Sequence, residues 1–223
     1  MSGPKDFSAT ARAVTATICG QTEVGPVRPG NQDAIVVVSA VAAVTGTRLT
    51  WTGRVPEAGA VVAVVDGMGG YAGGADAAAL AATALAEADP GRAPEDWDAW
   101  FEALSGRITR AGRAWDTPEM GATAAVLAIR PAGLVMANVG DCRIYRVAGG
   151  RLGRMSIDDR TQDPGSSAVT QALGGSARID AHVWEQDLKG GTERYVLCTD
   201  GVWGALEPDR KSTRLNSSHP AGS

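Results

Sequence analysis

The chain has 223 residues, 44% of them hydrophobic, and carries a formal net charge of −4 at pH 7. This length and apolar content suit one compact domain, and the mild acidity excludes the basic surface that nucleic acid or an anionic membrane would attract. No apolar run reaches the ~20 residues that span a bilayer, and the N-terminus lacks a signal-peptide pattern, so we predict a cytoplasmic protein.

The first part of the chain is predicted to form strands. Residues 1–13 are polar and expected to be frayed, and the domain is predicted to run over 14–208. Strands are predicted at 14–19, 34–44, 47–52 and 61–65, from β-branched runs and from alternation. The stretch 47–52 (TRLTWT) is expected to be a hairpin arm before the strand at 61–65.

Two helices are predicted in the middle of the chain. Residues 75–88 are rich in Ala and Leu and contain no Gly or Pro, so this helix is expected to pack closely on a sheet. Residues 94–115 begin with Pro and two acids, as helices do. Within them an apolar stripe at helical spacing, expected to be core, is formed by Trp97, Phe101, Leu104 and Ile108.

The later strands set the fold class. They are predicted at 122–129, 134–139, 143–147 and 195–199. Strands, two helices and then strands again indicate an α+β fold with mainly antiparallel sheets. The cysteines Cys19, Cys142 and Cys198 have no paired spacing and are expected to be reduced thiols, the last two as small buried hydrophobic residues.

Three apolar strands end at an aspartate beside a glycine. They are VVAVVDG at Asp66, LVMANVGD at Asp141 and YVLCTDG at Asp200. Each motif alone is also an ordinary turn pattern, so the inference depends on the set. Carboxylates at strand ends suit Mg2+ or Mn2+, and neighbouring glycines would clear room for ions, waters and a phosphate.

A fourth segment, VRPGNQDA, places Arg28 five residues before Asp33. Arginine binds phosphate through two parallel hydrogen bonds, and Asp33 would orient water beside a metal ion. A surface salt bridge is the alternative. No Arg stands six residues after any Cys, which excludes a cysteine-nucleophile phosphatase, and two histidines are too few for a histidine-rich dinuclear site.

In these motifs the chain resembles the bacterial type 2C metal-dependent Ser/Thr protein phosphatases. The similar segments, in the order of the family, are VRPGNQD, VVDGMGG, GATAAVLAI, ANVGDCRIYR, VTQALGG and LCTDGVWGAL. The resemblance implies a two-sheet antiparallel β-sandwich flanked by helices. It also implies hydrolysis of phosphoserine and phosphothreonine by a water molecule activated between two Mn2+ or Mg2+ ions.

The resemblance further implies a role for each site residue. Asp66 would bridge two ions, Gly67 would offer its carbonyl to one ion, and Asp200 would bind the other. Asp141, with Asp200, would hold a third, weaker ion. Arg28 would bind the phosphate and Asp33 would support the metal waters. Thr123 and Asn138 would be structural.

The implied partners are phosphorylated proteins, as substrates, and the Ser/Thr kinase that phosphorylates them; neither nucleic acid nor membrane is implied, and a monomer is expected. Two other functions remain open. One is a pseudophosphatase that binds phosphoproteins through Arg28 without hydrolysis, and the other is a metal-dependent hydrolase of small phosphorylated metabolites.

The chain departs from the family in four places. Gln32 stands where many relatives have Glu, and Met68 stands where animal members have His. The flap between Ser156 and Thr170 is short. The fourth departure is the tail at 209–223, which contains DRKSTRLNSSH, a string that one frame of a common sequencing adapter encodes. We therefore expect the tail to be non-native and the family's last helix, its C-terminal metal-ligand Asp and its last strand to be missing. A genuine disordered tail is the alternative.

Overall fold

The centre of the molecule is a six-stranded sheet with the strand order β10-β7-β6-β5-β2-β3, in which every neighbouring pair is antiparallel. The computed structural model describes residues 13–26, 28–69, 71–162, 168–176, 178–188 and 190–206. The strands of this sheet are β2 (Asp33–Val37), β3 (Ala40–Ala42), β5 (Ala60–Met68), β6 (Gly121–Ile129), β7 (Gly133–Val139) and β10 (His182–Asp187).

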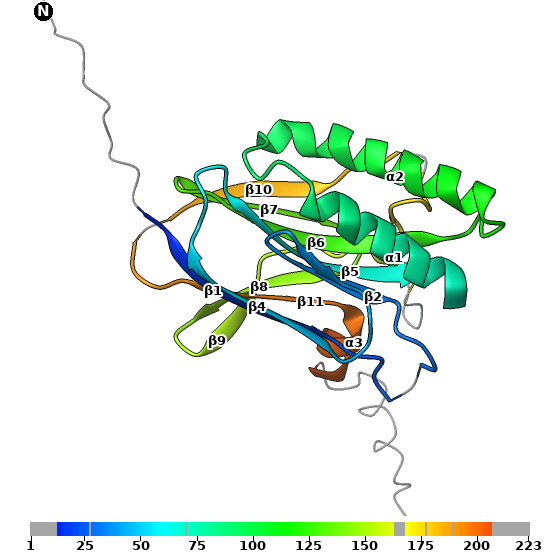
Figure 1. Ribbon diagram of the computed structural model, residues 1–223, viewed down its shortest axis with the longest axis horizontal. Coiled ribbons are helices and arrows are strands. Elements are labelled where there is room, and N and C mark those ends of the chain that lie inside the picture. The colour runs from blue at the N-terminus through cyan, green and yellow to red at the C-terminus, as the bar shows by residue number, and fades with distance from the viewer. Residues whose placement is uncertain are drawn as a thin grey trace, which may run out of the picture.

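Two long helices, α1 (Tyr71–Ala86) and α2 (Trp97–Ala114), cover one face of this sheet (Figure 1). A short 3-10 helix, η1 (Pro94–Asp96), leads into α2. The alanines of α1 are small enough for the helix to pack closely on β5, and several of them are fully buried there. The predicted apolar stripe of α2 is confirmed, because Trp97, Phe101, Leu104 and Ile108 are all at most 2% exposed.

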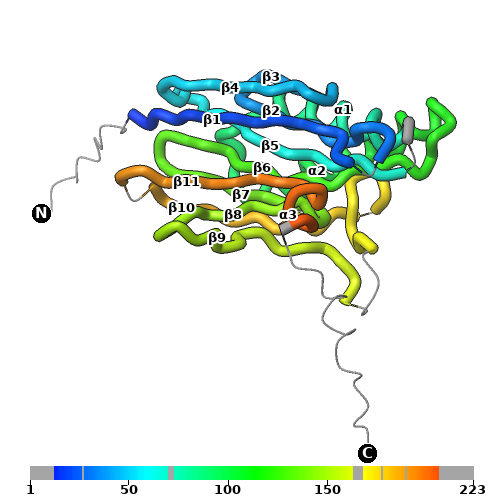
Figure 2. The backbone as a smooth tube through the Cα atoms, turned by 90° about the horizontal axis from the view of Figure 1, so that it is seen from below, coloured from blue at the N-terminus to red at the C-terminus, as the bar shows by residue number. Residues whose placement is uncertain are grey.

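A second layer of strands covers the other face of the sheet (Figure 2). It consists of two pieces: β1 (Thr15–Thr22) paired with β4 (Thr47–Arg54), and the order β11-β8-β9 formed by β11 (Arg194–Cys198), β8 (Arg143–Ala148) and β9 (Arg151–Arg154). Helix α3 (Asp200–Leu206) follows β11. The predicted α+β class and the antiparallel sandwich flanked by helices are therefore confirmed.

Hydrophobic residues pack in two clusters, one on each side of the large sheet. The first lies between the sheet and the helices and includes Val65, Leu85 and Phe101. The second lies between the two strand layers and includes Leu127 and Met136. Strand β6 is buried along its whole length because it faces both clusters.

The prediction of one strand at 34–44 was wrong. The chain reverses after Val37, and β3 pairs back on β2 with Val36 opposite Val41. Val38 makes this reversal at a φ of 62°, a conformation that β-branched residues seldom adopt. The run has no Gly, Pro or Asn that would have marked the turn.

Strand β4 includes the predicted 47–52, but its ladder partner is β1 rather than the following strand. Strand β5 continues through Asp66 and Gly67 to Met68, so the expectation that it ends at Asp66 was also wrong. The strands β9 and β10 and the helix α3 were not predicted. β9 and β10 are edge strands with few apolar residues, so neither shows a strong hydrophobic pattern.

Three predictions lie wholly or partly outside the described residues: the frayed N-terminus, the tail at 209–223 and part of the short flap. Among the described residues, all three cysteines are free thiols, and Cys142 and Cys198 are buried as predicted. None of the described helices is long and apolar enough to cross a membrane.

Candidate active site

A cavity of about 590 Å³ is lined in part by the start of α3. This helix lies at one end of the sandwich (Figure 1). All six predicted site residues line the cavity: Arg28, Asp33, Asp66, Gly67, Asp141 and Asp200. Arg28 comes from the loop before β2, Asp141 from the loop between β7 and β8, and Asp200 from the start of α3. The fold therefore brings together residues that are up to 172 positions apart in the chain.

The large sheet places two of the aspartates side by side. Asp33 opens β2 and lies directly opposite Asp66 on β5, and Asp66 lies opposite Thr123 on β6. Thr199, which follows β11, donates a hydrogen bond of 2.7 Å from its Oγ1 to Oδ2 of Asp33. This bond joins the two strand layers at the cavity and fixes one oxygen of Asp33.

Asn31, which the sequence analysis did not single out, ties down the loop that carries Arg28. Its Oδ1 accepts a 3.1 Å hydrogen bond from the backbone N–H of Asp33, and its Nδ2 donates 2.8 Å to Oγ1 of Thr22. Asn side chains commonly bond to backbone two residues later, so the Asn-x-Asp spacing was a usable indication.

Gly67 and Gly74 let the start of α1 approach β5. A Cβ on Gly67 would lie 1.9 Å from the carbonyl oxygen of Gly74, and the N–H of Gly67 donates 3.0 Å to the carbonyl oxygen of Gln32. This close backbone contact is a reason for glycine that the sequence did not indicate, beside the predicted room for ions and phosphate. The glycine is required first by helix packing.

We therefore expect Gly67→Ala to be strongly destabilising. The added methyl group clashes with backbone that cannot move without shifting α1, and overpacking of this kind costs about 1–3 kcal/mol or more. Gly30→Ala is the matched control, because Gly30 lines the same cavity and nothing lies within 4 Å of its Cβ position. Urea unfolding of both variants measures the difference; equal stability would contradict the close contact.

The carboxyl groups raise one another's pKa. Burial, followed by the charges of Asp33, Asp200 and Asp141, raises the pKa of Asp66 to about 9. Burial and the charge of Asp200 raise the pKa of Asp141 to about 6, against the lowering effect of Arg160. Burial also raises the pKa of Asp33, although its hydrogen bond from Thr199 opposes the shift. The cavity therefore crowds carboxyl groups whose ionised forms repel one another, a repulsion that the nearby arginines offset only in part.

This set of oxygen donors fits hard divalent cations. Within the described ranges, no three His, Cys, Asp or Glu side chains gather closely enough to hold a single ion between them. Mg2+ and similar ions commonly use only one or two carboxylates and keep several waters. Asp66, Asp141 and Asp200, spread along one cavity, suit several ions of that kind better than one closed protein cage.

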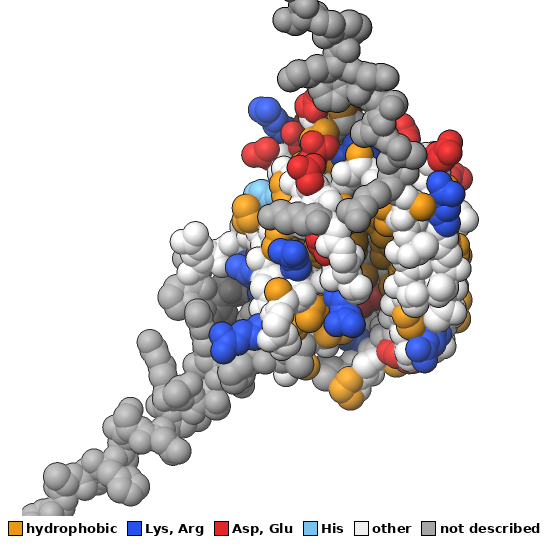
Figure 3. Space-filling view, turned by 90° about the vertical axis from the view of Figure 1, so that its left-hand side faces the viewer, with side chains coloured by type: hydrophobic (Ala, Val, Ile, Leu, Met, Phe, Trp, Pro, Cys, Tyr) orange, Lys and Arg blue, Asp and Glu red, His pale blue; other side chains and the backbone are white. Residues whose placement is uncertain are grey.

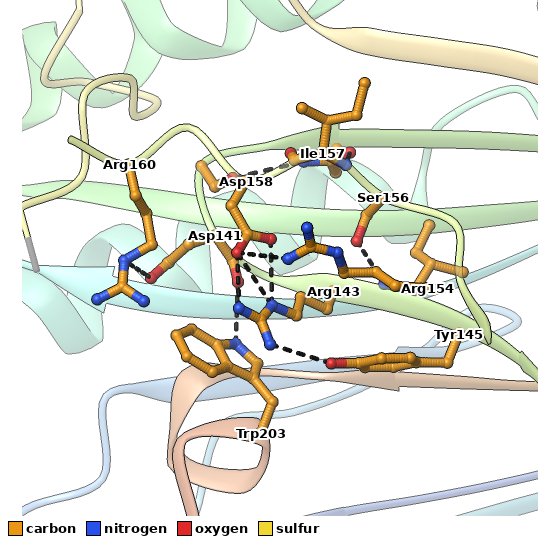
Figure 4. A network of polar contacts seen from close by, with 12 residues as sticks. Asp141, Arg143, Tyr145, Arg154, Ser156, Ile157, Asp158, Arg160 and Trp203 are labelled. Carbon is orange, nitrogen blue, oxygen red and sulfur yellow. Dashed lines mark hydrogen bonds and ion pairs between the residues drawn. The ribbon is translucent and has the colours of Figure 1, made fainter. Parts of the chain in front are cut away.

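A network around Trp203 supports the loop of Asp141 (Figure 4). The indole N–H of Trp203 donates 3.0 Å to the carbonyl oxygen of Asp141. The guanidinium carbon of Arg143 lies 3.6 Å from the centre of the Trp203 ring, and that of Arg160 lies 4.9 Å from it. Helix α3 is thereby fastened to the loop between β7 and β8.

Two arginines of this network meet carboxylates. Arg143 binds Asp158 through Nε, at 3.1 Å from both carboxylate oxygens, and through Nη2 at 2.7 Å. Arg160 Nε lies 3.6 Å from Oδ2 of Asp141, so its charge faces a candidate metal ligand (Figure 4). Arg143 and Trp203 lie inside the motifs ANVGDCRIYR and LCTDGVWGAL, but no role was predicted for either residue.

Asp159 holds the backbone of Gly140, the residue immediately before Asp141. Gly140, at a φ of 88°, donates its N–H to Oδ2 of Asp159 at 2.8 Å, and Asp159 also contacts His182 at 2.8 Å. Asn138 is fully buried and bonds both backbone groups of Ile157, at 2.6 and 3.3 Å. The loop that carries Asp141 is thus fixed on both sides.

A family model described as protein phosphatase 2C matches residues 50–219. The serine/threonine protein phosphatase PstP of Mycobacterium tuberculosis is 28% identical over 163 residues, which are 64% of this chain and 31% of PstP. The chain therefore spans about a third of the length of the curated relatives it matches.

Solved structures share the fold. The serine/threonine phosphatase of S. agalactiae has a TM-score of 0.69 at 22% identity, covering 93% of this chain and 88% of its own. PppA, a regulatory component of T6SS in Pseudomonas aeruginosa, has a TM-score of 0.68 at 24% identity, covering 93% and 86%. The PstP catalytic domain, in complex with two manganese ions, has a TM-score of 0.63 at 23% identity, covering 85% and 79%. These likenesses show the fold, and the family match over most of the chain shows that it belongs to the protein phosphatase 2C family.

Proposed function

We propose that this protein removes phosphate from phosphoserine and phosphothreonine in other proteins. The family supports this activity. The observation that carries the proposal is that Arg28 lines the same cavity as four aspartates, Asp33, Asp66, Asp141 and Asp200. Burial and the charges of neighbouring carboxylates raise the pKa of Asp66 and of Asp141. An arginine facing an acidic, cation-binding cavity is suited to a phosphate dianion bound between cations.

We propose that Mn2+ or Mg2+ occupies the acidic cavity as two ions, with a third in a weaker site. Asp66 would contact both main ions, the Gly67 carbonyl would contact one and Asp200 the other, and Asp141 with Asp200 would hold the third. The related PstP catalytic domain is described with two manganese ions. When bound, such ions act as Lewis acids on phosphoryl oxygens and lower the pKa of water.

The residues of the chain itself bind and orient. Arg28 would donate two hydrogen bonds to phosphoryl oxygens. Asp33, held by Thr199, would accept a hydrogen bond from an O–H of the attacking water and so orient it. Water attacks phosphorus in line, the bond from phosphorus to the serine or threonine oxygen breaks, and that oxygen takes a proton. Met68 lines the cavity but has no proton to give, so the proton comes from water.

No covalent enzyme intermediate is needed in this scheme. The one cysteine beside the site, Cys142, is fully buried, and burial raises the pKa of its thiol well above the usual value. A thiol that stays protonated is a poor nucleophile. Its 3.1 Å contact with Oγ1 of Thr123 is consistent with a structural role for both side chains.

We also propose a setting for the reaction: a monomer acting in the cytoplasm on proteins phosphorylated by a Ser/Thr kinase. The free thiols of Cys19, Cys142 and Cys198 support a reducing compartment. Reversal of kinase action follows from the proposed substrate, since a kinase forms the phosphoester that this site would hydrolyse.

Phosphate release from a phosphothreonine peptide tests the proposal. We expect release with Mn2+, none with a chelator, and a loss of about 10²-fold in kcat/KM for Arg28→Ala, because the phosphate loses its bidentate partner. Arg28→Lys is expected to restore part of the loss. Arg48→Ala is the matched control, since Arg48 is exposed on β4 and does not line the cavity.

Each alternative function has its own result in the same assay. Peptide binding that depends on Arg28, without release under any metal, would favour a pseudophosphatase. Faster release from nucleotides or sugar phosphates than from the peptide would favour a hydrolase of small metabolites. Release that continues in the presence of chelator would contradict the metal requirement.

A further inference from the structure

Arg160 places a positive charge beside Asp141, a proposed ligand of the third, weaker ion. Its Nε lies 3.6 Å from Oδ2 of Asp141, and its guanidinium points toward that carboxylate in Figure 4. The side chain of Asp141 is 6% exposed and that of Arg160 is 25% exposed, so solvent screens the pair only in part. Arginine is not deprotonated in proteins. The charge beside Asp141 is therefore permanent.

The backbone around Arg160 is tied to the loop between β7 and β8. The N–H of Asp159 donates 2.9 Å to the carbonyl oxygen of Gly140, and the N–H of Thr170 donates 2.8 Å to the carbonyl oxygen of Asp159. Arg160 lies opposite Val169 in an antiparallel bridge. Side chains opposite each other in such a pair share one face, and Val169 lines the acidic cavity. The backbone therefore directs the Arg160 side chain toward the cavity.

The ring of Trp203 holds the guanidinium of Arg160 in this position. The guanidinium carbon lies 4.9 Å from the centre of the ring, which is within the range of a cation–π interaction. The same indole donates its N–H, at 3.0 Å, to the carbonyl oxygen of Asp141. Because the Trp203 ring is buried, it has little freedom to move. Arg160 and Asp141 are thus placed against one fixed group.

The contact between Arg160 and Asp141 is an ion pair without a short hydrogen bond. Charged N–H donors usually lie about 2.7–2.9 Å from a carboxylate oxygen. Arg143 meets Asp158 in this way, with Nη2 at 2.7 Å from Oδ2. The longer separation of 3.6 Å leaves Oδ2 of Asp141 able to coordinate a cation without first breaking a strong bond to Arg160. The charge of Arg160 would still act on that cation.

We propose that Arg160 supplies at this site the positive charge that a third ion would otherwise supply, and that it thereby keeps the binding of that ion weak. This inference rests on the proposed function, in which Asp141 and Asp200 are the ligands of the third ion. A divalent ion at Asp141 would be repelled by the nearby Arg160 charge, and we expect this repulsion to lower its affinity about tenfold. The third site should therefore fill only at Mn2+ concentrations above those that fill the two main sites.

Calorimetric titration of the full chain with Mn2+ tests the role of Arg160. The titration is done in an Asp66→Asn background, because Asp66 is the proposed shared ligand of the two main ions and its loss leaves the third site to be measured. Adding Arg160→Gln is expected to tighten Mn2+ binding about tenfold, since the repelling charge is gone. Adding Arg160→Lys keeps a positive charge and is expected to leave Kd close to that of the background. A merely structural role for Arg160 would not produce tighter binding.

Arg54→Gln is the matched control for the loss of one positive charge. Arg54 is exposed and lies opposite Thr15 at the start of β1. Figure 3 views the end of the molecule at which β1 starts, and several Lys or Arg side chains are exposed there. The other end of β1 reaches the site, where Oγ1 of Thr22 donates 3.2 Å to the carbonyl oxygen of Asp33. The eight residues of β1 span about 25 Å, so the charge of Arg54 is screened and Kd should not change.

Each other outcome of the titration has a definite meaning. Unchanged or weaker Mn2+ binding in Arg160→Gln, while the chain with Asp66 intact binds two Mn2+ ions, would overturn this inference and leave the proposed function in place. Equally tight binding in Arg160→Gln and Arg160→Lys would also overturn it, because charge would then not be the cause. A chain that binds no Mn2+ in any variant would overturn both proposals. Adding Asp141→Asn to Arg160→Gln should cancel the gain, since that carboxylate is the proposed ligand.

Discussion

Replacing Asp66 by Asn is expected to reduce phosphate release strongly and, at the same time, to remove most of the stabilisation of the protein by Mn2+. Asp66 lines the acidic cavity, and the charges of Asp33, Asp200 and Asp141 all act on it. Loss of the proposed shared ligand should reduce kcat by about 10³-fold, as the removal of a principal electrostatic group does in other enzymes.

Thermal unfolding gives a result that does not depend on catalysis. At 100 times Kd, Mn2+ should stabilise the wild-type chain by about 2.7 kcal/mol, which is roughly 5–10 °C in Tm for a domain of this size. We expect only a small shift for Asp66→Asn, because Asp141 and Asp200 keep the weaker site. Without metal, the variant should be at least as stable as wild type, because it removes a buried carboxyl group crowded by like charges.

Asp76→Asn is the matched control for this experiment. Asp76 is exposed on α1 and does not line the cavity, so this variant should keep both activity and the Mn2+ shift. A full Mn2+ shift in Asp66→Asn would contradict the assignment of Asp66 as the shared ligand. A metal-free variant that unfolds much earlier than wild type would contradict the electrostatic description of the cavity.

Replacing Trp203 by Ala is expected to have the largest effect on stability. The ring is 5% exposed and lies against Arg143, and its N–H is bonded to the Asp141 carbonyl oxygen. Truncation of a buried Trp costs about 3–5 kcal/mol. A loss of 3 kcal/mol corresponds to roughly 6–12 °C in Tm. The loop of Asp141 should lose order, so that binding of the third, weaker ion also declines.

Trp203→Phe separates packing from the hydrogen bond. It keeps an aromatic face for Arg143 but removes the N–H donor, which should cost only about 1 kcal/mol. Trp115→Ala is the control for loss of an aromatic side chain, because Trp115 is 54% exposed at the end of α2. Equal destabilisation by Trp203→Ala and Trp115→Ala, measured by urea unfolding, would refute a fastening role for Trp203.

The sequence predicted elements well where hydrophobic periodicity is strong. The apolar runs of β5 and β6, the Ala-rich helix α1 and the aromatic stripe of α2 all bury a continuous face, so their patterns are visible in a single segment. The reversal at Val38 and the edge strand β9 depend on contacts with other segments. No local pattern shows that Val38 must turn so that β3 can pair with β2.

In the candidate site, too, residues with a local motif could be predicted and residues that act through distant contacts could not. Its charged residues were found because Asp66, Asp141 and Asp200 share one local motif, and all lie in one cavity. Thr199 and Arg160 were missed because their importance comes only from the distant residues they meet, Asp33 and Asp141. The packing reason for glycine at position 67 was missed for a related cause: the carbonyl group of Gly74 that excludes a side chain belongs to the next element.

The placement of Asp66 inside β5 has a consequence for how the site comes apart. Strand β5 is hydrogen-bonded to β2 and β6 on both sides, so the amides around Asp66 should open only when the whole domain unfolds. Asp200 belongs to α3, a helix of seven residues at one end of the molecule. Local unfolding of α3 would therefore release the Asp200 carboxylate while Asp66 stays in place on β5. The amides of α3 should then exchange with solvent faster than those around Asp66.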